Sequence, residues 1–256
     1  MHRVALTSAW SSDVASLKDL AVMCENEQYL QLCRVLLGQE RPSLDSLNSA
    51  MSGNLVRVMM PCKSVRKLYG PGCSLLHLTG HLAAHPLYRL CTVRALPQVV
   101  KGAEAFTSDS WTALQRRMVQ LCEAGSLVDR PSGSPEVRST RCRAVSASAF
   151  LWGDDLSEAS LEPLKKMPLW QHSVDGMQVH ADAHHVGGLD RSLGCISNCQ
   201  AVLPALSSTT SRATSMLRAS AYLHQYERYG LSREEMSEAI LVMLQVQHDY
   251  EQLSSD

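Results

Sequence analysis

The chain has 256 residues, with 24 basic and 25 acidic side chains and a formal net charge of −1. This balance, without a basic stripe, argues against nucleic acid as a partner and against a polybasic membrane anchor. No apolar run approaches the roughly 20 residues that a membrane-spanning helix needs. The 9 cysteines are an odd number and form no CxxC pair, which is typical of buried thiols in a reducing compartment. We therefore expect a cytosolic protein whose partners are neither membranes nor nucleic acids.

Two helices are predicted within the first 60 residues. Apolar spacing indicates one helix at residues 27–37 and a longer, largely buried one at residues 44–60. Each helix carries an asparagine close to its beginning, Asn26 and Asn48. Asn26 stands at an N-cap position, which asparagine favours. Asn48 is typical of a surface residue in the first turn of a helix. From the residues alone, these amides need no function beyond structure.

Residues 87–200 are predicted to form one α/β unit. A short helix at residues 74–84 precedes it and ends where His85 meets Pro86, because a residue before proline disfavours the helical region. An amphipathic helix at residues 110–125 follows the first strand, with Trp111 and Met118 on its apolar side. A further short helix is expected around residues 161–167. The predicted strands are residues 87–96, 142–152, 177–186 and 192–198.

The last segment is predicted to be a helical hairpin. The first helix ends at Gly230, and the second opens with Ser232 and Glu235, the two residues of a capping box. Apolar side chains of the second helix recur from Met236 to Tyr250 at helical spacing.

Several strings resemble the tubulin family. "NEQYLQLC…ERPSLDSLN" is similar to the tubulin run NEALYDIC…ERPTYTNLN without a gap, and "AYLHQYERYG" resembles AFLHWYTGEG. "HPLYRLCTVRALP" and "SDSW" are similar to the delta branch of the family. The resemblance covers essentially the whole chain and implies an α/β fold with α+β character. Its three parts are a remnant of the GTPase domain with a long central helix (1–86), an intermediate α/β domain (87–200) and the C-terminal helical hairpin (201–256).

The resemblance gives the two asparagines a function. In tubulins the matching residues reach the guanine edge of GTP, which implies that Asn26 and Asn48 bind the base. An amide offers a donor and an acceptor, as the edge of guanine requires. Leu44 stands where tubulins commonly carry a tyrosine that stacks on the base. The lost aromatic contact is worth about 1 kcal/mol.

The phosphate-binding loop GGGTGSG of tubulins is not found in the sequence, nor is another phosphate-binding motif. We therefore expect the chain to correspond to the C-terminal part of a tubulin and to bind GTP weakly by itself. Without the sheet of the missing half, the apolar side of the helix at residues 44–60 should be exposed. This expectation concerns Leu44, Leu47, Met51 and Leu55.

The resemblance implies a structural cytoskeletal protein of centrioles and basal bodies, with other tubulin subunits as partners and GTP as the ligand of the full-length form. Any enzymatic activity would be GTPase-like, and the present chain is expected not to be catalytic. In tubulins that complete a neighbour's GTPase site, an acidic residue helps to position the attacking water. Aligning "HLAAHP" with the family's NLVPYP puts His77 at that position.

Two other functions are compatible with the residues. A small metal-dependent enzyme could use His180, Asp182 and His184, which alternate along one strand, although alternation also predicts a solvated strand face. His77 and His81 share a helix face, with Cys73 one turn before them and His85 at the helix end, and could also bind metal. Neither group contains a recognised metallohydrolase motif. The other alternative is a non-enzymatic interaction module that binds a partner through the C-terminal hairpin.

Overall fold

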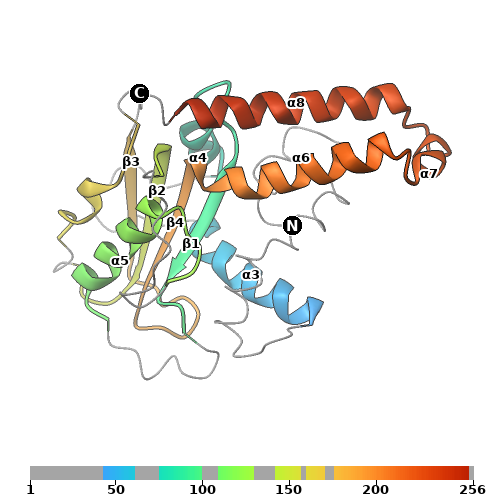
Figure 1. Cartoon of the computed structure of the whole chain (residues 1–256). Coiled ribbons are helices and arrows are strands. Elements are labelled where there is room, and N and C mark those ends of the chain that lie inside the picture. The colour runs from blue at the N-terminus through green and yellow to red at the C-terminus, as the bar shows by residue number, and fades with distance from the viewer. Residues whose placement is uncertain are drawn as a thin grey trace.

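The computed structural model describes residues 43–60, 75–99, 109–129, 142–156, 160–170 and 176–253. At its centre is a four-stranded sheet with helices on both faces (Figure 1). In spatial order the strands are β1 (Cys91–Leu96), β4 (Arg191–Cys199), β2 (Ala144–Gly153) and β3 (Met177–Asp182). β4 is antiparallel to both of its neighbours, whereas β2 and β3 are parallel. The predicted α/β class is confirmed.

One face of the sheet is covered by α5 (Trp111–Glu123) and the short helix η5 (Leu164–Lys166). Ser110 caps α5 by accepting a hydrogen bond from the Ala113 N–H at 3.2 Å. The predicted inward side chains of α5 are all buried: Trp111, Leu114, Met118 and Leu121. Ala149 and Leu151 of β2 pack in the same core.

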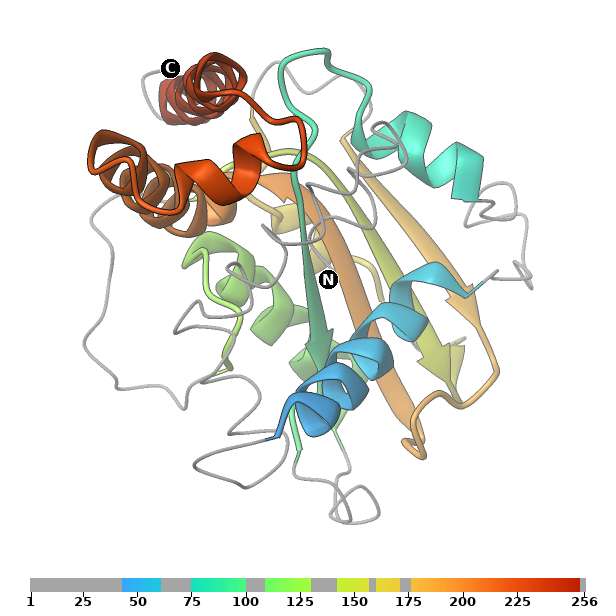
Figure 2. The ribbon, with the colours of Figure 1, turned by 90° about the vertical axis from the view of Figure 1, so that its right-hand side faces the viewer.

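The opposite face is covered by α3 (Leu44–Met59) and α4 (Leu75–Leu82), seen in blue and blue-green in Figure 2. Val58 and Leu78 pack there with Phe150, which alternates along β2 with the residues that contact α5. The expected exposure of α3 is wrong for Met51, which is 7% exposed, because α3 lies directly on β1, β4 and β2. Leu55 is partly buried, and the side chains of Leu44 and Leu47 lie outside what the structure describes.

The C-terminal helices are α6 (Leu203–Arg218), α7 (Leu223–Glu227) and α8 (Arg233–Gln252), joined to β4 by the turn η6 (Gln200–Val202). The α6–α8 hairpin extends away from the sheet (Figure 1). The predicted capping box is confirmed, with Ser232 and Glu235 bonding each other's backbone N–H groups. The single helix expected before Gly230 is divided, because Ser220 and Tyr222 adopt φ values of 49° and 58°. In the described segments no helix is long and apolar enough to span a bilayer.

Candidate functional site

Of the three predicted base-binding residues, the structure places two on α3. Leu44 is its first residue, and Asn48 lies in its second turn with an exposed side chain. The backbone carbonyl of Asn48 accepts a hydrogen bond from Ser52 Oγ at 2.8 Å, which leaves the amide of the side chain out of this contact. Asn26 lies outside the described residues, so the pairing of the two amides stays a prediction.

The opposite end of α3 is fixed to the sheet. Gly194 of β4 lies so close to the helix that a Cβ atom built on it would be 2.8 Å from Val58 Cγ1 and 3.0 Å from the Arg57 carbonyl oxygen. Trp152 of β2 donates its indole N–H to the same carbonyl at 2.7 Å. Arg57 also donates to Asn54 at 3.1 Å, and burial lowers the pKa of its guanidinium. These contacts attach the last turn of α3 to β2 and β4.

α4 is held by its last turn. Ser146 of β2 and Asn198 of β4 donate to the Leu82 carbonyl at 3.0 and 2.8 Å. His81 is buried, with Nε2 3.1 Å from the Ala147 carbonyl oxygen, whereas His77 is exposed one turn earlier. His77 is therefore the residue of this pair that a neighbouring molecule can reach.

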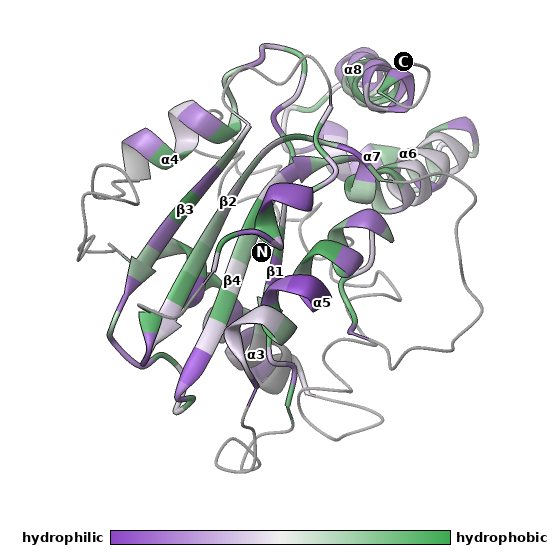
Figure 3. Cartoon of the chain, turned by 90° about the vertical axis from the view of Figure 1, so that its left-hand side faces the viewer, coloured by the Kyte–Doolittle hydropathy of each residue, from purple (hydrophilic) through white to green (hydrophobic). Residues whose placement is uncertain are grey.

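Of the three residues expected on a solvated strand face, only His184 is exposed, and it lies beyond the end of β3. β3 is one of the two edge strands and carries hydrophilic stretches where β2 and β4 are mostly apolar (Figure 3). Nevertheless His180 and Asp182 are 3% and 2% exposed. His180 stacks on Phe150 with ring centroids 5.0 Å apart, beneath α4. Burial, followed by the nearby His77 and His81, lowers the pKa of His180 to about 4.

The proposed metal set does not assemble. His184 lies beyond the end of β3, where its Nδ1 and backbone N–H both contact Asp182. The two ring nitrogens of His180 have no hydrogen-bond partner in the structure. Among the described residues no group of three His, Cys, Asp or Glu side chains could hold a metal ion. The geometry thus gives no support to the metal-dependent enzyme.

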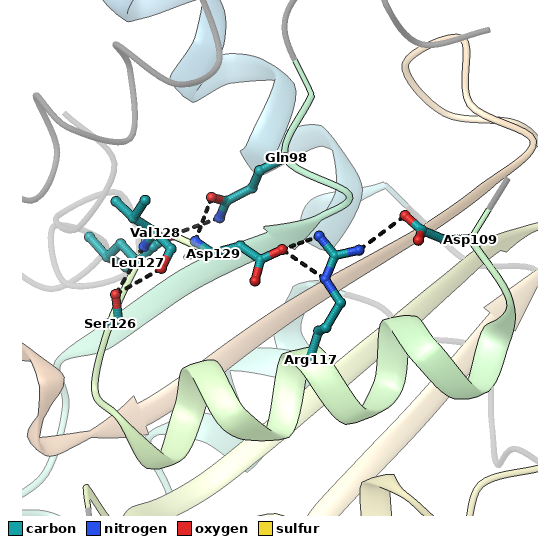
Figure 4. A network of polar contacts seen from close by, with 7 residues as sticks. All are labelled: Gln98, Asp109, Arg117, Ser126, Leu127, Val128 and Asp129. Atoms are coloured by element: carbon teal, nitrogen blue, oxygen red, sulfur yellow. Dashed lines mark hydrogen bonds and ion pairs between the residues drawn. The ribbon is translucent and has the colours of Figure 1, made fainter. Parts of the chain in front are cut away.

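A polar network that the sequence did not reveal joins α5 to the flanking loops (Figure 4). Arg117 bridges Asp109 at 3.1 Å and Asp129, to which its Nε donates at 2.8 Å. Gln98 donates to the Leu127 carbonyl at 2.7 Å and accepts from the Asp129 N–H at 2.8 Å. Hydrogen bonding and attraction by Asp129, and then Asp109, raise the pKa of Arg117 despite opposing desolvation. The network holds both ends of the chain segment between β1 and α5. An arginine on the polar side of a helix is too common a signal to have identified it.

No protein-family model matches the chain. The human protein named tubulin delta chain is 23% identical over 252 residues, which cover 91% of this chain and 56% of the relative. The dog tubulin delta chain is 22% identical over the same shares, and a tubulin beta-1 chain of Chondrus crispus is 23% identical over 243 residues, covering 91% and 50%.

The chain therefore spans about half the length of the curated relatives it matches. Its similarity to delta chains nevertheless extends over 91% of its own length, and the structure is a mixed α/β fold. The resemblance of the short strings to the tubulin family is thereby confirmed: this is a tubulin-like chain, with similarity to the tubulin delta chains and to a beta chain.

Proposed function

We propose that the chain is part of a structural cytoskeletal subunit of the delta-tubulin type that acts at centrioles and basal bodies and assembles with other tubulin subunits. The observation that carries the proposal is the similarity to tubulin delta chains over 91% of the chain. The position of α3 supports it, because Asn48 and Ser49 of this helix are exposed and can border a further domain. The exposed Asn48 is compatible with a ligand there.

In this function GTP is the ligand, and its guanine base contacts Asn26, Leu44 and Asn48. Asn48 is an exposed amide that can donate and accept at the same time. The base contacts alone provide little affinity, since most of the binding energy for a triphosphate comes from contacts to its phosphates. We therefore propose that the protein binds GTP only when its phosphate-binding half is also present.

Localisation and co-purification test the cytoskeletal proposal together. A fluorescently tagged chain expressed in ciliated cells should concentrate at centrioles and basal bodies, and purified α/β-tubulin should co-purify with it. A tag without the chain is the control. Uniform cytoplasmic fluorescence together with no retention of tubulin would contradict the proposal.

The alternative of an interaction module is favoured by one observation on α8. This helix exposes three large apolar residues, with Leu241 63%, Val242 59% and Leu244 43% exposed. Exposed apolar side chains gathered on one element are compatible with a protein contact. Replacing Leu241 and Val242 with glutamate should abolish retention of tubulin if the hairpin provides the contact. Unchanged retention would place the contact elsewhere on the chain.

A further inference from the structure

Arg94 is an arginine inside the sheet domain. It lies on β1 and is 1% exposed, although a guanidinium remains charged in proteins. Nε donates to the Ser126 carbonyl at 2.8 Å and Nη1 donates to Ser197 Oγ at 2.9 Å. Within the described part of the chain no carboxylate forms an ion pair with it. A buried positive charge without a counter-ion is strongly unfavourable, so its partner must be sought among other groups.

The anion that the geometry offers is the sulfur of Cys199. Nη1 and Nη2 of Arg94 each lie 3.9 Å from Cys199 Sγ, and Ser197 Oγ donates to the same sulfur at 3.4 Å. Cys199 is 2% exposed, so water does not compete for it. Three donors directed at one sulfur stabilise a thiolate, which is also the reactive form of cysteine.

A second thiol lies beside this sulfur. Cys142 precedes β2, packs with Cys199 in one small cluster and is 9% exposed. The hydrogen bond from Cys142, and then the charge of Arg94, hold the pKa of Cys199 well below its usual range. The hydrogen bond to Cys199 and burial raise the pKa of Cys142. The donors around Cys199 therefore favour the thiolate on this sulfur and leave the proton on Cys142.

We propose that Cys199 and Cys142 form a peroxide-sensitive dithiol. Arg94 and Ser197 stabilise Cys199 as a thiolate, and this thiolate is the group that the peroxide oxidises. The oxidant is a hydroperoxide. The Cys199 thiolate attacks one oxygen of hydrogen peroxide, and the O–O bond breaks. Hydroxide is released, and Cys199 becomes a sulfenic acid. The Cys142 sulfur then displaces the sulfenic oxygen, which leaves as water with the proton of the thiol, and a disulfide forms.

Two other cysteine sites in the same domain serve as internal comparisons. Cys122 of α5 and Cys195 of β4 are also hydrogen-bonded to each other, and this bond and then the charge of Arg94 lower the pKa of Cys122. The hydrogen bonds from Arg94 to sulfur described above, however, are directed at Cys199. Cys91 packs in the core on the α3 and α4 face, where burial raises the pKa of its thiol to about 12. Selective oxidation of Cys199 is therefore distinguishable from general oxidation of buried thiols.

The test uses the full chain, exposed to hydrogen peroxide for a series of times. After acid quenching and unfolding, free thiols are alkylated and peptides are identified by mass spectrometry. The Cys142–Cys199 disulfide should be the first product, formed at least roughly tenfold faster than Cys91 is oxidised. In Cys142→Ser, Cys199 should instead accumulate as a sulfenic acid that a dimedone probe traps. Earlier formation of a Cys122–Cys195 disulfide, equal oxidation of Cys91, or resistance of Cys199 would each overturn the proposal.

A matched pair of serine variants tests the role of the donors. Ser197→Ala removes the hydroxyl that donates to Cys199, whereas Ser192→Ala removes a buried hydroxyl of the same strand that has no hydrogen-bond partner in the structure. Ser197→Ala should slow oxidation of Cys199 by roughly threefold or more, and Ser192→Ala should leave it unchanged. Circular dichroism checks that both variants fold. Equal rates in the two variants would contradict the assignment of Ser197.

Discussion

Tyr250, near the end of α8, donates its hydroxyl to Asn198 Oδ1 near the end of β4 over 2.5 Å. The same hydroxyl accepts from the Leu90 N–H at 2.8 Å. Asn198 in turn donates to the carbonyls of Leu82 and Tyr88 at 2.8 and 2.7 Å. Both side chains are fully buried. A single pair of residues therefore connects the hairpin, the central strand and the chain that leaves α4.

Tyr250→Phe should destabilise the protein because it leaves Asn198 Oδ1 and the Leu90 N–H buried without this partner. The expected loss in the free energy of unfolding is about 1–3 kcal/mol, measured by urea denaturation. Hydrogen exchange should also accelerate in α8. Tyr229→Phe is the matched control, since Tyr229 is 85% exposed and its variant should unfold like the parent. Equal stability of the two variants would contradict the role of the hydroxyl.

Gly194→Ala should destabilise the contact between α3 and β4. The new methyl group would meet Val58 Cγ1 at 2.8 Å and the Arg57 carbonyl at 3.0 Å, so that the helix must move. Overpacking of this kind reduces the free energy of unfolding by about 1–3 kcal/mol. Gly53→Ala is an informative control, because Gly53 lies within α3 with open space around it and alanine there should stabilise by about 0.5–1 kcal/mol. Thermal denaturation of both variants should give shifts of opposite sign.

His180 should make the stability of the protein fall at mildly acidic pH. Its pKa is lowered from the usual 6.5 to about 4 by burial, so the unfolded chain binds a proton first as the pH falls. The contribution of the neutral His180 side chain to the free energy of unfolding is complete above pH 6.5. It is lost progressively as the pH falls to about 4. It amounts to about 1–3 kcal/mol. His180→Leu should flatten the urea-denaturation free energy over this range, and an unchanged slope would contradict the buried neutral imidazole.

His185 is the control, because its effect on the pH dependence of the stability has the opposite sign. His185 is bonded to Asp154 at 3.0 Å, and this hydrogen bond and the negative charge raise its pKa. Its contribution is present at low pH and lost as the pH rises through the raised pKa. His185→Asn should therefore steepen the acid loss slightly, whereas His180→Leu reduces it. Identical profiles for the two variants would show that neither histidine determines the slope.

The sequence was most informative where the determining contacts are local. The capping box of Ser232 and Glu235 and the apolar side of α5 depend on residues three or four apart, and the structure has both. Alternation failed for His180 because the side chain is covered by α4 and by Phe150, which come from distant parts of the chain. Hydropathy along one strand contains no information about which helix covers it.

Long-range pairing explains the other differences. Met51 was expected to be exposed because the sheet of a missing half was taken as its partner, whereas α3 packs on the sheet that follows it in the chain. The contact between Arg94 and Cys199 joins residues 105 positions apart on two paired strands. An arginine within the apolar string "CTVRAL" was a signal of a buried charge, but the identity of its partner required the strand order.

Asn48→Ala should weaken GTP binding in a protein that also carries the phosphate-binding half. Loss of one or two hydrogen bonds to guanine predicts a roughly tenfold weaker affinity and a smaller preference for GTP over ATP, measured by isothermal titration. Ser49→Ala, at the neighbouring exposed position of α3, is the control. Leu44→Tyr should act in the opposite direction, since an aromatic ring adds about 1 kcal/mol of stacking. Unchanged affinity and selectivity in Asn48→Ala would remove this residue from the site.

The last prediction concerns hydrolysis of GTP bound to a neighbouring subunit. His77 is exposed on α4, at the position where the resemblance puts an acidic residue that positions the attacking water. A neutral imidazole can accept a proton but supplies no negative charge, and a protonated imidazole is a poorer base still.

The chain should therefore contact its neighbour without stimulating hydrolysis efficiently, and behave as a stable junction. Co-assembly of the full-length protein with a GTP-loaded tubulin partner, followed by phosphate release, measures this directly. His77→Glu should increase the release rate by roughly tenfold or more, within the range of a general base, while His224→Glu on the exposed part of α7 should not. Stimulation by the parent chain that disappears in His77→Ala would show instead that the imidazole itself is catalytic. No stimulation by the parent and a gain in His77→Glu would establish that the missing carboxylate is what keeps the junction stable.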